Sequence, residues 1–238
     1  MNFINCTKHI TFQNYNLFYK GNISLLEKPK IAIVGTRHPS QYSKLMTIKL
    51  SQILSKKYVI VSGGAMGIDA IAHQNAQSTI MVSPAGIDKI YPKINKNLIE
   101  DIANNHLLIS EYEKGYSPKK YSFIQRNRIV VGISEFVIIV EADENSGSMR
   151  SAEIAKKIGK KVFVISHRIG ESKGTNKLVQ NNQAKLILDI EEFAKNLEID
   201  NNTNKILDYN EAFREYGDKL FEMELNGEVS IRDGKVIF

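Results

Sequence analysis

Short apolar runs alternate with longer amphipathic stretches along most of the chain. The runs are rich in branched aliphatic side chains and predict strands over residues 31–34, 58–61, 79–82, 107–109, 136–140, 162–165 and 186–188. Apolar residues at helical spacing predict helices near residues 42–54, 95–104, 122–133 and 148–158. Strands this continuously apolar are buried on both faces, and spacers this long form parallel crossovers. The pattern therefore predicts an α/β fold with an open, mostly parallel sheet covered by helices on both faces.

Both ends of the chain depart from this pattern. Residues 1–30 show no clean period and are interpreted as an N-terminal cap segment laid over a sheet edge, ahead of an α/β domain over residues 31–196. In residues 205–238 the pattern predicts a helix that closes at Asn226-Gly227, followed by a hairpin with a type I′ turn at Asp233-Gly234. The polar run Asn201-Asn202-Thr203-Asn204 is the expected linker to this small module.

Charge is distributed unevenly over the 238 residues. The formal net charge is +6, yet residues 197–238 carry −5, so residues 1–196 carry +11. A basic body favours an acidic partner such as nucleic acid, and an acidic tail argues against DNA binding by the small module. Cys6 is the only cysteine, which excludes an intrachain disulfide and fits a reducing compartment. Because no apolar segment approaches the length of a bilayer span, we expect a soluble, cytoplasmic protein.

Two glycine- and serine-containing turns follow predicted strands and open predicted helices. They are Ser62-Gly63-Gly64 and Ser146-Gly147-Ser148. Ligand sites of parallel α/β sheets lie beyond the carboxyl ends of the strands, and glycine lets the backbone approach an anion at a helix start. With Arg37 and Lys93 nearby in the same set of loops, the turns predict a phosphate-binding basin. The alternative is a tight turn without a ligand, flanked by solvated surface charges.

Residues 118–128 alternate cations with aromatic rings. Lysine and arginine spaced in this way bind the backbone of a single-stranded nucleic acid, while aromatic faces stack its bases. Lys120, Phe123 and Arg126 are the members of interest, and Phe123 could share a helical face with Arg126. The alternative is that Tyr121 and Phe123 are core residues and that Arg126 is a surface charge.

A series of short motifs occurs in one order along the chain. They are Val34-Gly35-Thr36-Arg37, Ser62 to Ala70 with His73, Gly86-Ile87-Asp88 with Tyr91-Pro92, Ile109-Ser110-Glu111, Phe123 with Arg126-Asn127-Arg128, Val140-Glu141-Ala142 and Ser146-Gly147-Ser148. From about Leu17 onward the chain resembles the DNA-processing protein A (DprA, or Smf) family. The resemblance implies an extended Rossmann-like domain that binds and protects incoming single-stranded DNA and loads a RecA-type recombinase in natural transformation. It also implies a homodimer that needs neither a nucleotide cofactor nor a metal.

The same resemblance implies residue roles. Arg37, Lys93 and Lys120 would bind phosphates, Phe123 would stack a base, and Arg126 and Arg128 would add charge. Arg128 could equally be a buried partner of Glu141 or Glu111. The DNA pocket would also include Ser62, Gly63, Gly64, Ser146, Gly147 and Ser148, and the dimer contacts would fall on Asn176, Val179 and Leu186.

Some positions depart from the family pattern. Gly64 and Met66 replace a usual leucine and a usual basic residue, so the rim lacks one expected positive charge. Ser166-His167 replaces a usual Pro-Gly. The amino-terminal helical domain of many members is not expected here, and the tail resembles a shortened form of their winged-helix module.

The main alternative is a nucleotide-binding Rossmann enzyme. Asp88 lies near the distance at which an NAD site places its acidic residue, but the turn lacks a Gly-x-Gly-x-x-Gly register. A phosphoribohydrolase-like motif is approached only by Ser146 to Glu153 and lacks its Pro-Gly-Gly. No P-loop, metal-binding histidine spacing or nucleophile elbow occurs. We therefore expect no catalytic residue, no metal and no cofactor, with His73 packed in its helix and Asp69 complementing the helix dipole.

Overall fold

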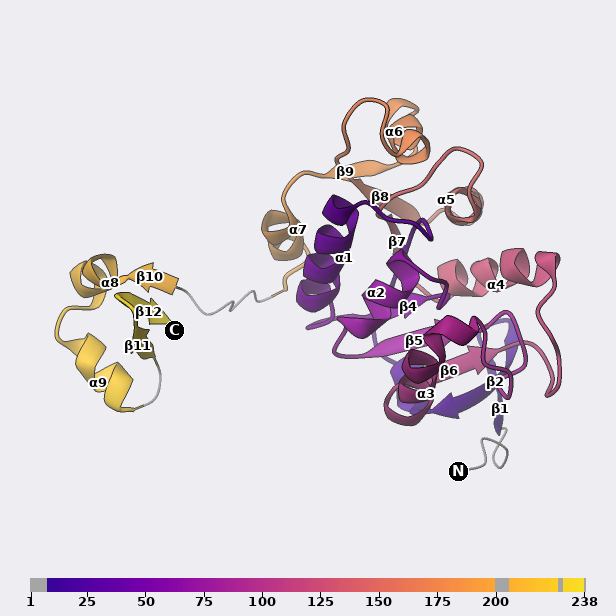
Figure 1. Cartoon of the computed structure of the whole chain (residues 1–238), viewed down its shortest axis with the longest axis horizontal. Helices are drawn as coiled ribbons and strands as arrows, with labels where there is room; N and C mark the ends of the chain where they lie inside the picture. The colour runs from indigo at the N-terminus through magenta and orange to yellow at the C-terminus, as the bar shows by residue number, and fades with distance from the viewer. Residues whose placement is uncertain (1–7, 200–205, 227–228, 238) are drawn as a thin grey trace. The chain divides into compact units, whose positions relative to one another are not determined.

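The computed structural model describes residues 8–199, 206–226 and 229–237 (Figure 1). Cys6, the expected linker Asn201 to Asn204, and Gly227 lie outside these residues. The chain divides into two compact units, residues 1–199 and residues 200–238. The first is the α/β unit that contains the candidate site.

One mixed sheet organises the first unit. Among the described residues it has nine strands in the order β1-β2-β6-β5-β4-β3-β7-β8-β9. In chain order they are β1 (Lys8–Phe12), β2 (Tyr15–Gly21), β3 (Lys30–Val34), β4 (Val59–Ser62), β5 (Thr79–Val82), β6 (Leu107–Ser110), β7 (Phe136–Ile139), β8 (Lys161–Ile165) and β9 (Lys185–Ile187). All pairings from β6 to β9 are parallel. The predicted α/β class with a mostly parallel sheet is confirmed.

The segment expected to be a cap is instead the edge of the sheet. Strands β1 and β2 form an antiparallel hairpin, and β2 continues the sheet by pairing antiparallel with β6, Tyr19 opposite Ile109. Leu17 is fully buried. The described part of residues 1–30 therefore extends the sheet at its edge, since the backbone of β1 pairs with β2 and that of β2 pairs with β6.

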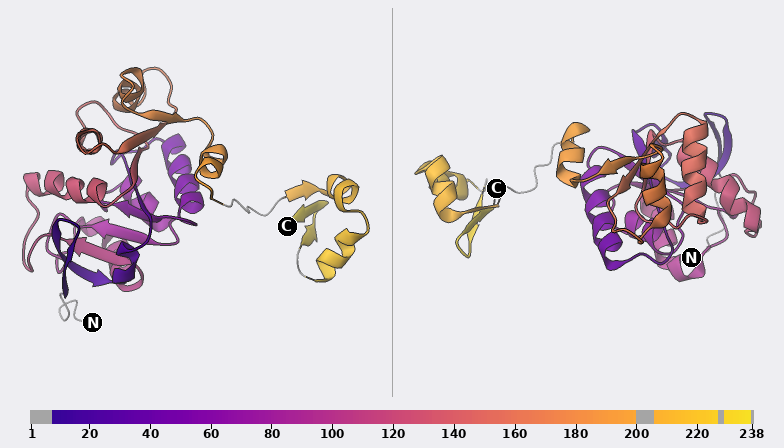
Figure 2. Two further views of the ribbon diagram at one scale, coloured as in Figure 1. Left: turned by 180° about the vertical axis from the view of Figure 1, so that it is seen from behind. Right: turned by 90° about the horizontal axis from the view of Figure 1, so that it is seen from above.

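Helices cover both faces of the sheet (Figure 2). They are α1 (Gln41–Leu54), α2 (Ile68–Gln74), α3 (Lys96–Asn105), α4 (Lys120–Gly132), α5 (Gly147–Lys157), α6 (Lys173–Gln180) and α7 (Ile190–Asn196). Alternate residues of β3 enter different cores. Ala32 and Val34 pack with residues of α4, α5 and α6, whereas Ile31 and Ile33 pack with residues of α1, α2 and α7. Burial on both faces explains why the strands are continuously apolar.

The order of the strands creates a crevice at the carboxyl ends of β3 and β7. The chain proceeds from β3 through β4 and β5 to β6 on one side and then places β7 on the other side of β3. The helix that follows β3, α1, covers one face, and the helix that follows β7, α5, covers the other. Loops that diverge in this way leave the ligand crevice of an open α/β sheet.

The second unit is a small α/β module. It contains β10 (Ile206–Asp208), α8 (Tyr209–Tyr216), α9 (Lys219–Leu225), β11 (Ser230–Arg232) and β12 (Lys235–Ile237), with sheet order β10-β12-β11. Its core includes Ala212, Leu220 and Val236. Asp233 and Gly234 both have positive φ, 50° and 70°, which confirms the predicted type I′ turn.

Candidate nucleic-acid interface

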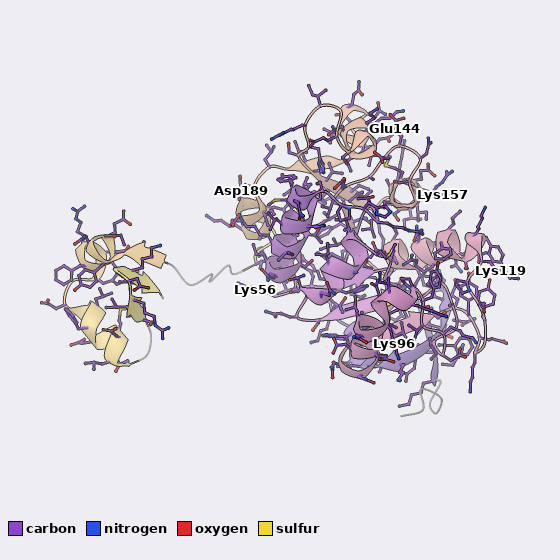
Figure 3. All side chains as sticks on the ribbon, in the orientation of Figure 1. Lys56, Lys96, Lys119, Glu144, Lys157 and Asp189 are labelled. Atoms are coloured by element: carbon purple, nitrogen blue, oxygen red, sulfur yellow. The ribbon has the colours of Figure 1, made fainter. Side chains whose placement is uncertain are left out.

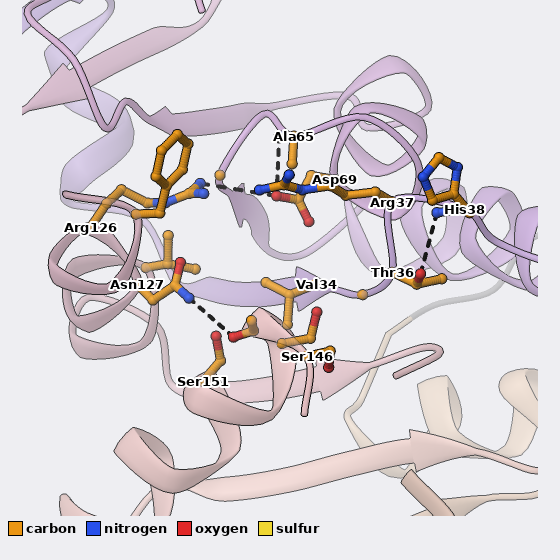
Figure 4. Close-up of a pocket in the computed structure, with 16 residues that line it drawn as sticks. Val34, Thr36, Arg37, His38, Ala65, Asp69, Arg126, Asn127, Ser146 and Ser151 are labelled. Atoms are coloured by element: carbon orange, nitrogen blue, oxygen red, sulfur yellow. Dashed lines mark hydrogen bonds and ion pairs between the residues drawn. The ribbon is translucent and has the colours of Figure 1, made fainter. Parts of the chain in front are cut away.

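A cavity of about 310 Å³ lies at the crevice between the ends of β3 and β7 (Figure 4). Four segments line it: the loop after β3, the turn after β4, one face of α4 and the start of α5. A smaller cavity of about 60 Å³ lies beside it and shares Arg37, Phe123 and Arg126 with it. The fold thus brings together loops that are far apart in the sequence, at the edge of the sheet where the sequence predicted a site.

Arg37 and Phe123 stand at the boundary of the two cavities. The guanidinium carbon of Arg37 lies 5.9 Å from the centroid of the Phe123 ring, a cation–π distance. The ring of Tyr91 meets Phe123 edge to face at 5.5 Å. Arg37 is exposed, and within the described residues no hydrogen bond or ion pair engages its guanidinium group. A free cation against a partly exposed ring can bind a phosphate and a base side by side.

The turn after β4 differs from the expected anion site. Ser62 is fully buried, and its hydroxyl donates to the carbonyl oxygen of Ile33 at 2.7 Å. The N–H of Ala65 donates to the carboxylate of Asp69 at 3.3 Å. Burial raises the pKa of Asp69, and the backbone hydrogen bonds from Ala65 and Gly63 oppose that shift. The anion at this turn is therefore an internal one. Of Ser62, Gly63 and Gly64, Gly63 alone lines the cavity. The N–H donors of Gly63 and Ala65 are directed at Asp69.

Arg126 was expected at the surface and is instead buried beneath this turn. Its side chain is 6% exposed, with a guanidinium nitrogen 4.0 Å from a carboxylate oxygen of Asp69 and 3.4 Å from the carbonyl oxygen of Val82. A Cβ atom at Gly63 would lie 1.1 Å from that nitrogen, so only glycine leaves room for it. Burial raises the pKa of Asp69, and the positive charge of Arg126 opposes this shift. Asp69 lies in the first turn of α2, as its expected role toward the helix dipole requires, and it also forms this buried ion pair.

The start of α5 keeps the character of an anion site. Ser146 is the N-cap residue, but no side chain caps the helix, and the buried Oγ of Ser146 has no hydrogen-bond partner. Nothing lies within 4 Å of the position of a Cβ on Gly147. Ser146, Gly147 and Ser148 all line the cavity. The first N–H groups of a helix have no intrahelical partner, so this helix start offers donors to a phosphate.

The other expected cations lie outside the cavity. Lys93 is exposed at the start of a short 3-10 helix, Lys93–Asn95, and Lys120 is exposed at the first residue of α4, one turn before Phe123. Arg128 forms an ion pair with Glu111 and stacks on the ring of Tyr15 at 5.2 Å. Of the two carboxylates considered for it, Glu111 is the partner, and Arg128 is not among the residues that line the cavity.

The residues expected at a dimer interface lie on α6 and β9. The side-chain amide of Asn176 donates to the carbonyl oxygens of Arg168 and Glu171, at 3.2 and 2.9 Å. Val179 packs partly against the core, and Leu186 is 38% exposed on the edge strand. These positions stay a prediction.

His73 packs inside the fold as expected. Thr79 donates its hydroxyl proton to the carbonyl oxygen of Ile60, so Nδ1–H of His73 donates to Oγ1 of Thr79 at 2.6 Å, and the buried Nε2 has no partner. Burial, followed by the nearby positive charge of Arg126, lowers the pKa of His73 to about 3. The ring is a neutral structural group. Over the described ranges, no group of three or more histidine, cysteine or acidic side chains could hold a metal ion, and none of the helices could span a bilayer.

Comparison with known proteins gives consistent similarities. The family model of DNA recombination-mediator protein A matches residues 2–198. DNA processing protein DprA of Streptococcus pneumoniae is 45% identical over 177 residues, which cover 72% of this chain and 62% of that protein. The structure of DNA processing protein A from Helicobacter pylori, described for its single-stranded DNA binding mode, matches with a TM-score of 0.80 and 44% identity over 83% of this chain and 98% of that chain. The S. pneumoniae DprA structure matches with a TM-score of 0.75 and 38% identity, over 82% and 75% of the two chains.

Proposed function

Because this chain belongs to the DNA recombination-mediator protein A family, we propose that it is a DNA-processing protein that binds single-stranded DNA in the crevice between β3 and β7. It acts on the strand as a binding protein, without catalysing a reaction on it. Its strand-binding unit is residues 1–199, whose basic charge supplies the attraction for phosphates.

The contact between Arg37 and Phe123 carries this proposal. The guanidinium group of Arg37 has no partner among the described residues, and it stacks at 5.9 Å on a ring that is partly exposed. One face of Phe123 can stack an unpaired base while Arg37 binds the adjacent phosphate. Paired bases in a duplex cannot present a face in this way, so the arrangement favours a single strand.

The Asp69–Arg126 ion pair argues against the nucleotide-enzyme alternative. A dinucleotide fold places its pyrophosphate on the N–H groups of the glycine turn after an early strand. Here those donors face the carboxylate of Asp69. A pyrophosphate at the same position would meet a buried negative charge, which is unfavourable for an anionic ligand.

The wider role rests on family membership. In this wider role, the protein protects incoming single-stranded DNA and loads a RecA-type recombinase. It acts as a homodimer through the surface around Asn176, Val179 and Leu186. The chain spans 62% of the length of the S. pneumoniae relative, so parts of that protein have no counterpart in the match. Sedimentation of the purified chain tests the dimer, and strand-exchange assays with a RecA-type recombinase test the loading.

The first experiment is anisotropy with a fluorescent oligothymidine, the matching duplex, ATP and NAD, at about 50 and 200 mM salt. We expect binding of the single strand that weakens steeply with salt, weaker binding of the duplex, and no competition by the nucleotides. Lys120→Glu should weaken binding by reversing the charge one turn before Phe123. Lys161→Glu is the matched control, since Lys161 is exposed at the amino end of β8, whereas the site lies at the carboxyl ends of the strands. Nucleotide binding with indifference to the oligonucleotide would contradict the proposal.

A further inference from the structure

Three tyrosines and a lysine form a second aromatic surface outside the cavity, in which Tyr121 and Lys119 are exposed and Tyr112 and Tyr116 are half-buried. The rings of Tyr112 and Tyr116 stack at 4.1 Å with an interplanar angle of 7°, and the hydroxyl of Tyr116 donates to that of Tyr121 at 2.9 Å. The ammonium group of Lys119 lies 6.0 Å from the Tyr116 ring and 5.9 Å from the Tyr121 ring. We call these four residues the tyrosine cluster. Figure 3 shows Lys119 at the outer end of α4.

The tyrosine cluster and the cavity lie on different faces of α4. Phe123, Arg126 and Asn127 line the cavity. Tyr121 and Ile124, on the other side of the helix, are 48% and 53% exposed. Tyr121 precedes Phe123 by only two residues, so a strand that leaves the Phe123 ring around the start of α4 meets the Tyr121 ring next.

The charges around the cluster suit a polyanion. Lys114, Lys119 and Lys120 are all exposed there and outnumber the one exposed carboxylate, Glu113, whereas Glu111 is neutralised by its ion pair with Arg128. The hydrogen bond to Tyr121 raises the pKa of Tyr116 to about 12. Exposed aromatic rings beside lysines are the composition of a single-strand binding surface.

A purely structural role explains only part of the arrangement. The hydroxyl of Tyr112 donates to Gln125 at 2.8 Å, which ties residues 111–119 to α4 and accounts for one ring. It does not account for Tyr121, which leaves half of its surface in water on the first turn of the helix. An exposed ring of this size, held by a hydrogen bond and a cation, is preorganised to stack on another flat group.

We propose that the tyrosine cluster is a second base-stacking site, on which a single strand continues after it leaves Phe123. The inference rests on the proposed function and extends it from one pocket to a path around the start of α4. The ligand class is single-stranded nucleic acid longer than the few nucleotides that the cavity itself accommodates.

The test compares Tyr121→Ala with Tyr121→Phe on oligothymidines of about 4 and about 16 nucleotides. Tyr121→Ala removes the ring, so we expect roughly tenfold weaker binding of the long strand and unchanged binding of the short one. Tyr121→Phe keeps the ring and loses only the hydroxyl contact, so it should bind both strands like the wild type. In the wild-type protein, 5-iododeoxyuridine placed at successive positions of the long strand should crosslink to the tyrosine cluster at one position and to Phe123 at another.

The outcomes separate this inference from the proposed function. Equal long-strand affinity of Tyr121→Ala and wild type, with no crosslink to residues 112–121, overturns the second site while short-strand binding still supports the first. An equal loss on a blunt duplex overturns base stacking, because a duplex presents only its backbone there. If the wild type binds neither strand, both proposals fall.

Discussion

Phe123 and Arg126 lie three residues apart on α4, and their surroundings give them different roles. Phe123 keeps a partly exposed ring against Arg37, whereas Arg126 is buried against Asp69. The sequence showed an aromatic residue and a cation at helical spacing, which fits either residue as the exposed one. What decides is Gly63, whose missing side chain opens the space that the guanidinium group fills. The sequence pattern of α4 cannot show that Gly63, on another element, leaves space for the side chain of Arg126.

Replacing Phe123 tests the stacking role at the scale of one ring. Phe123→Ala should weaken oligothymidine binding by roughly tenfold or more, because a base stacked on an aromatic residue contributes about 1–3 kcal/mol. Phe123→Tyr keeps the ring and should bind within about twofold of the wild type. Anisotropy titrations measure both. Phe213→Ala, which removes an exposed ring from the C-terminal module, is the control and should leave affinity unchanged. Equal affinities for Phe123→Ala and the wild type would contradict the site.

His73 makes the free energy of unfolding depend on pH. Its pKa is lowered to about 3 in the folded protein, against 6.5 for the ordinary side chain, chiefly by burial. Between these values the unfolded chain binds a proton that the folded chain does not, so its contribution to stability is complete above pH 6.5 and is lost as the pH falls. The slope from this group is about 1.4 kcal/mol of unfolding free energy per pH unit.

Urea denaturation at pH 7, 6 and 5 measures that dependence. His73→Gln should lose less stability between pH 7 and pH 5 than the wild type, whatever its stability at pH 7. His38→Gln, at an exposed position, should keep the wild-type slope. Parallel pH curves for His73→Gln and the wild type would show that His73 is not the responsible group.

At the scale of elements, the two glycine-containing helix starts differ in their capacity to bind an external anion, because their surroundings differ. Both follow a buried strand, and the sequence predicted an anion at each. The short helix α2 begins beside Asp69 and supplies its own carboxylate, while α5 begins with an uncapped Ser146 and an open cavity. Asp69 was visible in the sequence, but only its burial with Arg126 shows that it competes with an external anion.

Alanine at the two glycines should therefore have opposite effects. Gly63→Ala displaces Arg126 from Asp69, and breaking a buried pair costs about 3–5 kcal/mol of unfolding free energy. Gly147→Ala meets no atom within 4 Å and should leave stability unchanged or slightly higher, since alanine favours a helix. Its methyl group faces the cavity, so oligothymidine binding should weaken by roughly tenfold through loss of a close phosphate contact. Urea denaturation and anisotropy on the same samples separate the two effects; a destabilised Gly147→Ala with normal affinity would refute the assignment.

Helices and strands whose secondary structure is determined by their own residues could be predicted from the sequence. The seven predicted strands match β3 to β9. Strands β3 to β7 are buried on both faces, which demands continuous apolar runs. The hairpin of β1 and β2 was missed, because β2 pairs at the sheet edge with only Leu17 fully buried and shows no continuous run. Helix α6 was also missed; it is short, and its N-cap Ser172 has a left-handed backbone that sequence rules do not anticipate. Pairings and burials that depend on distant segments require the structure.

At the scale of the whole molecule, affinity should follow the number of phosphates that the protein neutralises. For a single strand, the logarithm of the binding constant falls with the logarithm of salt concentration by about 0.7 per neutralised phosphate. Arg37→Ala, Lys93→Ala and Lys120→Ala should each reduce the slope by roughly that amount. Lys161→Ala, at the amino end of β8, should not change the slope. A variant with the wild-type slope would remove that residue from the phosphate contacts.

The last prediction concerns which of the two units binds DNA. Residues 200–238 carry nine acidic and five basic residues, so a chain that ends at Ile199 has a formal net charge of +10 in place of +6. The α/β unit contains the candidate site within its own sheet and cores, so the shortened chain should fold and bind oligothymidine at least as tightly as the full chain. Any gain should shrink as salt rises, because it comes from the long-range field and not from a contact.

Glu222→Gln with Glu224→Gln in the full chain is the matched control, since it removes two of the same charges and should shift affinity in the same direction by less. Anisotropy at two salt concentrations, after circular dichroism has shown that the shortened chain is folded, measures all three proteins. Tenfold weaker binding by the shortened chain would instead assign a direct DNA contact to the acidic module.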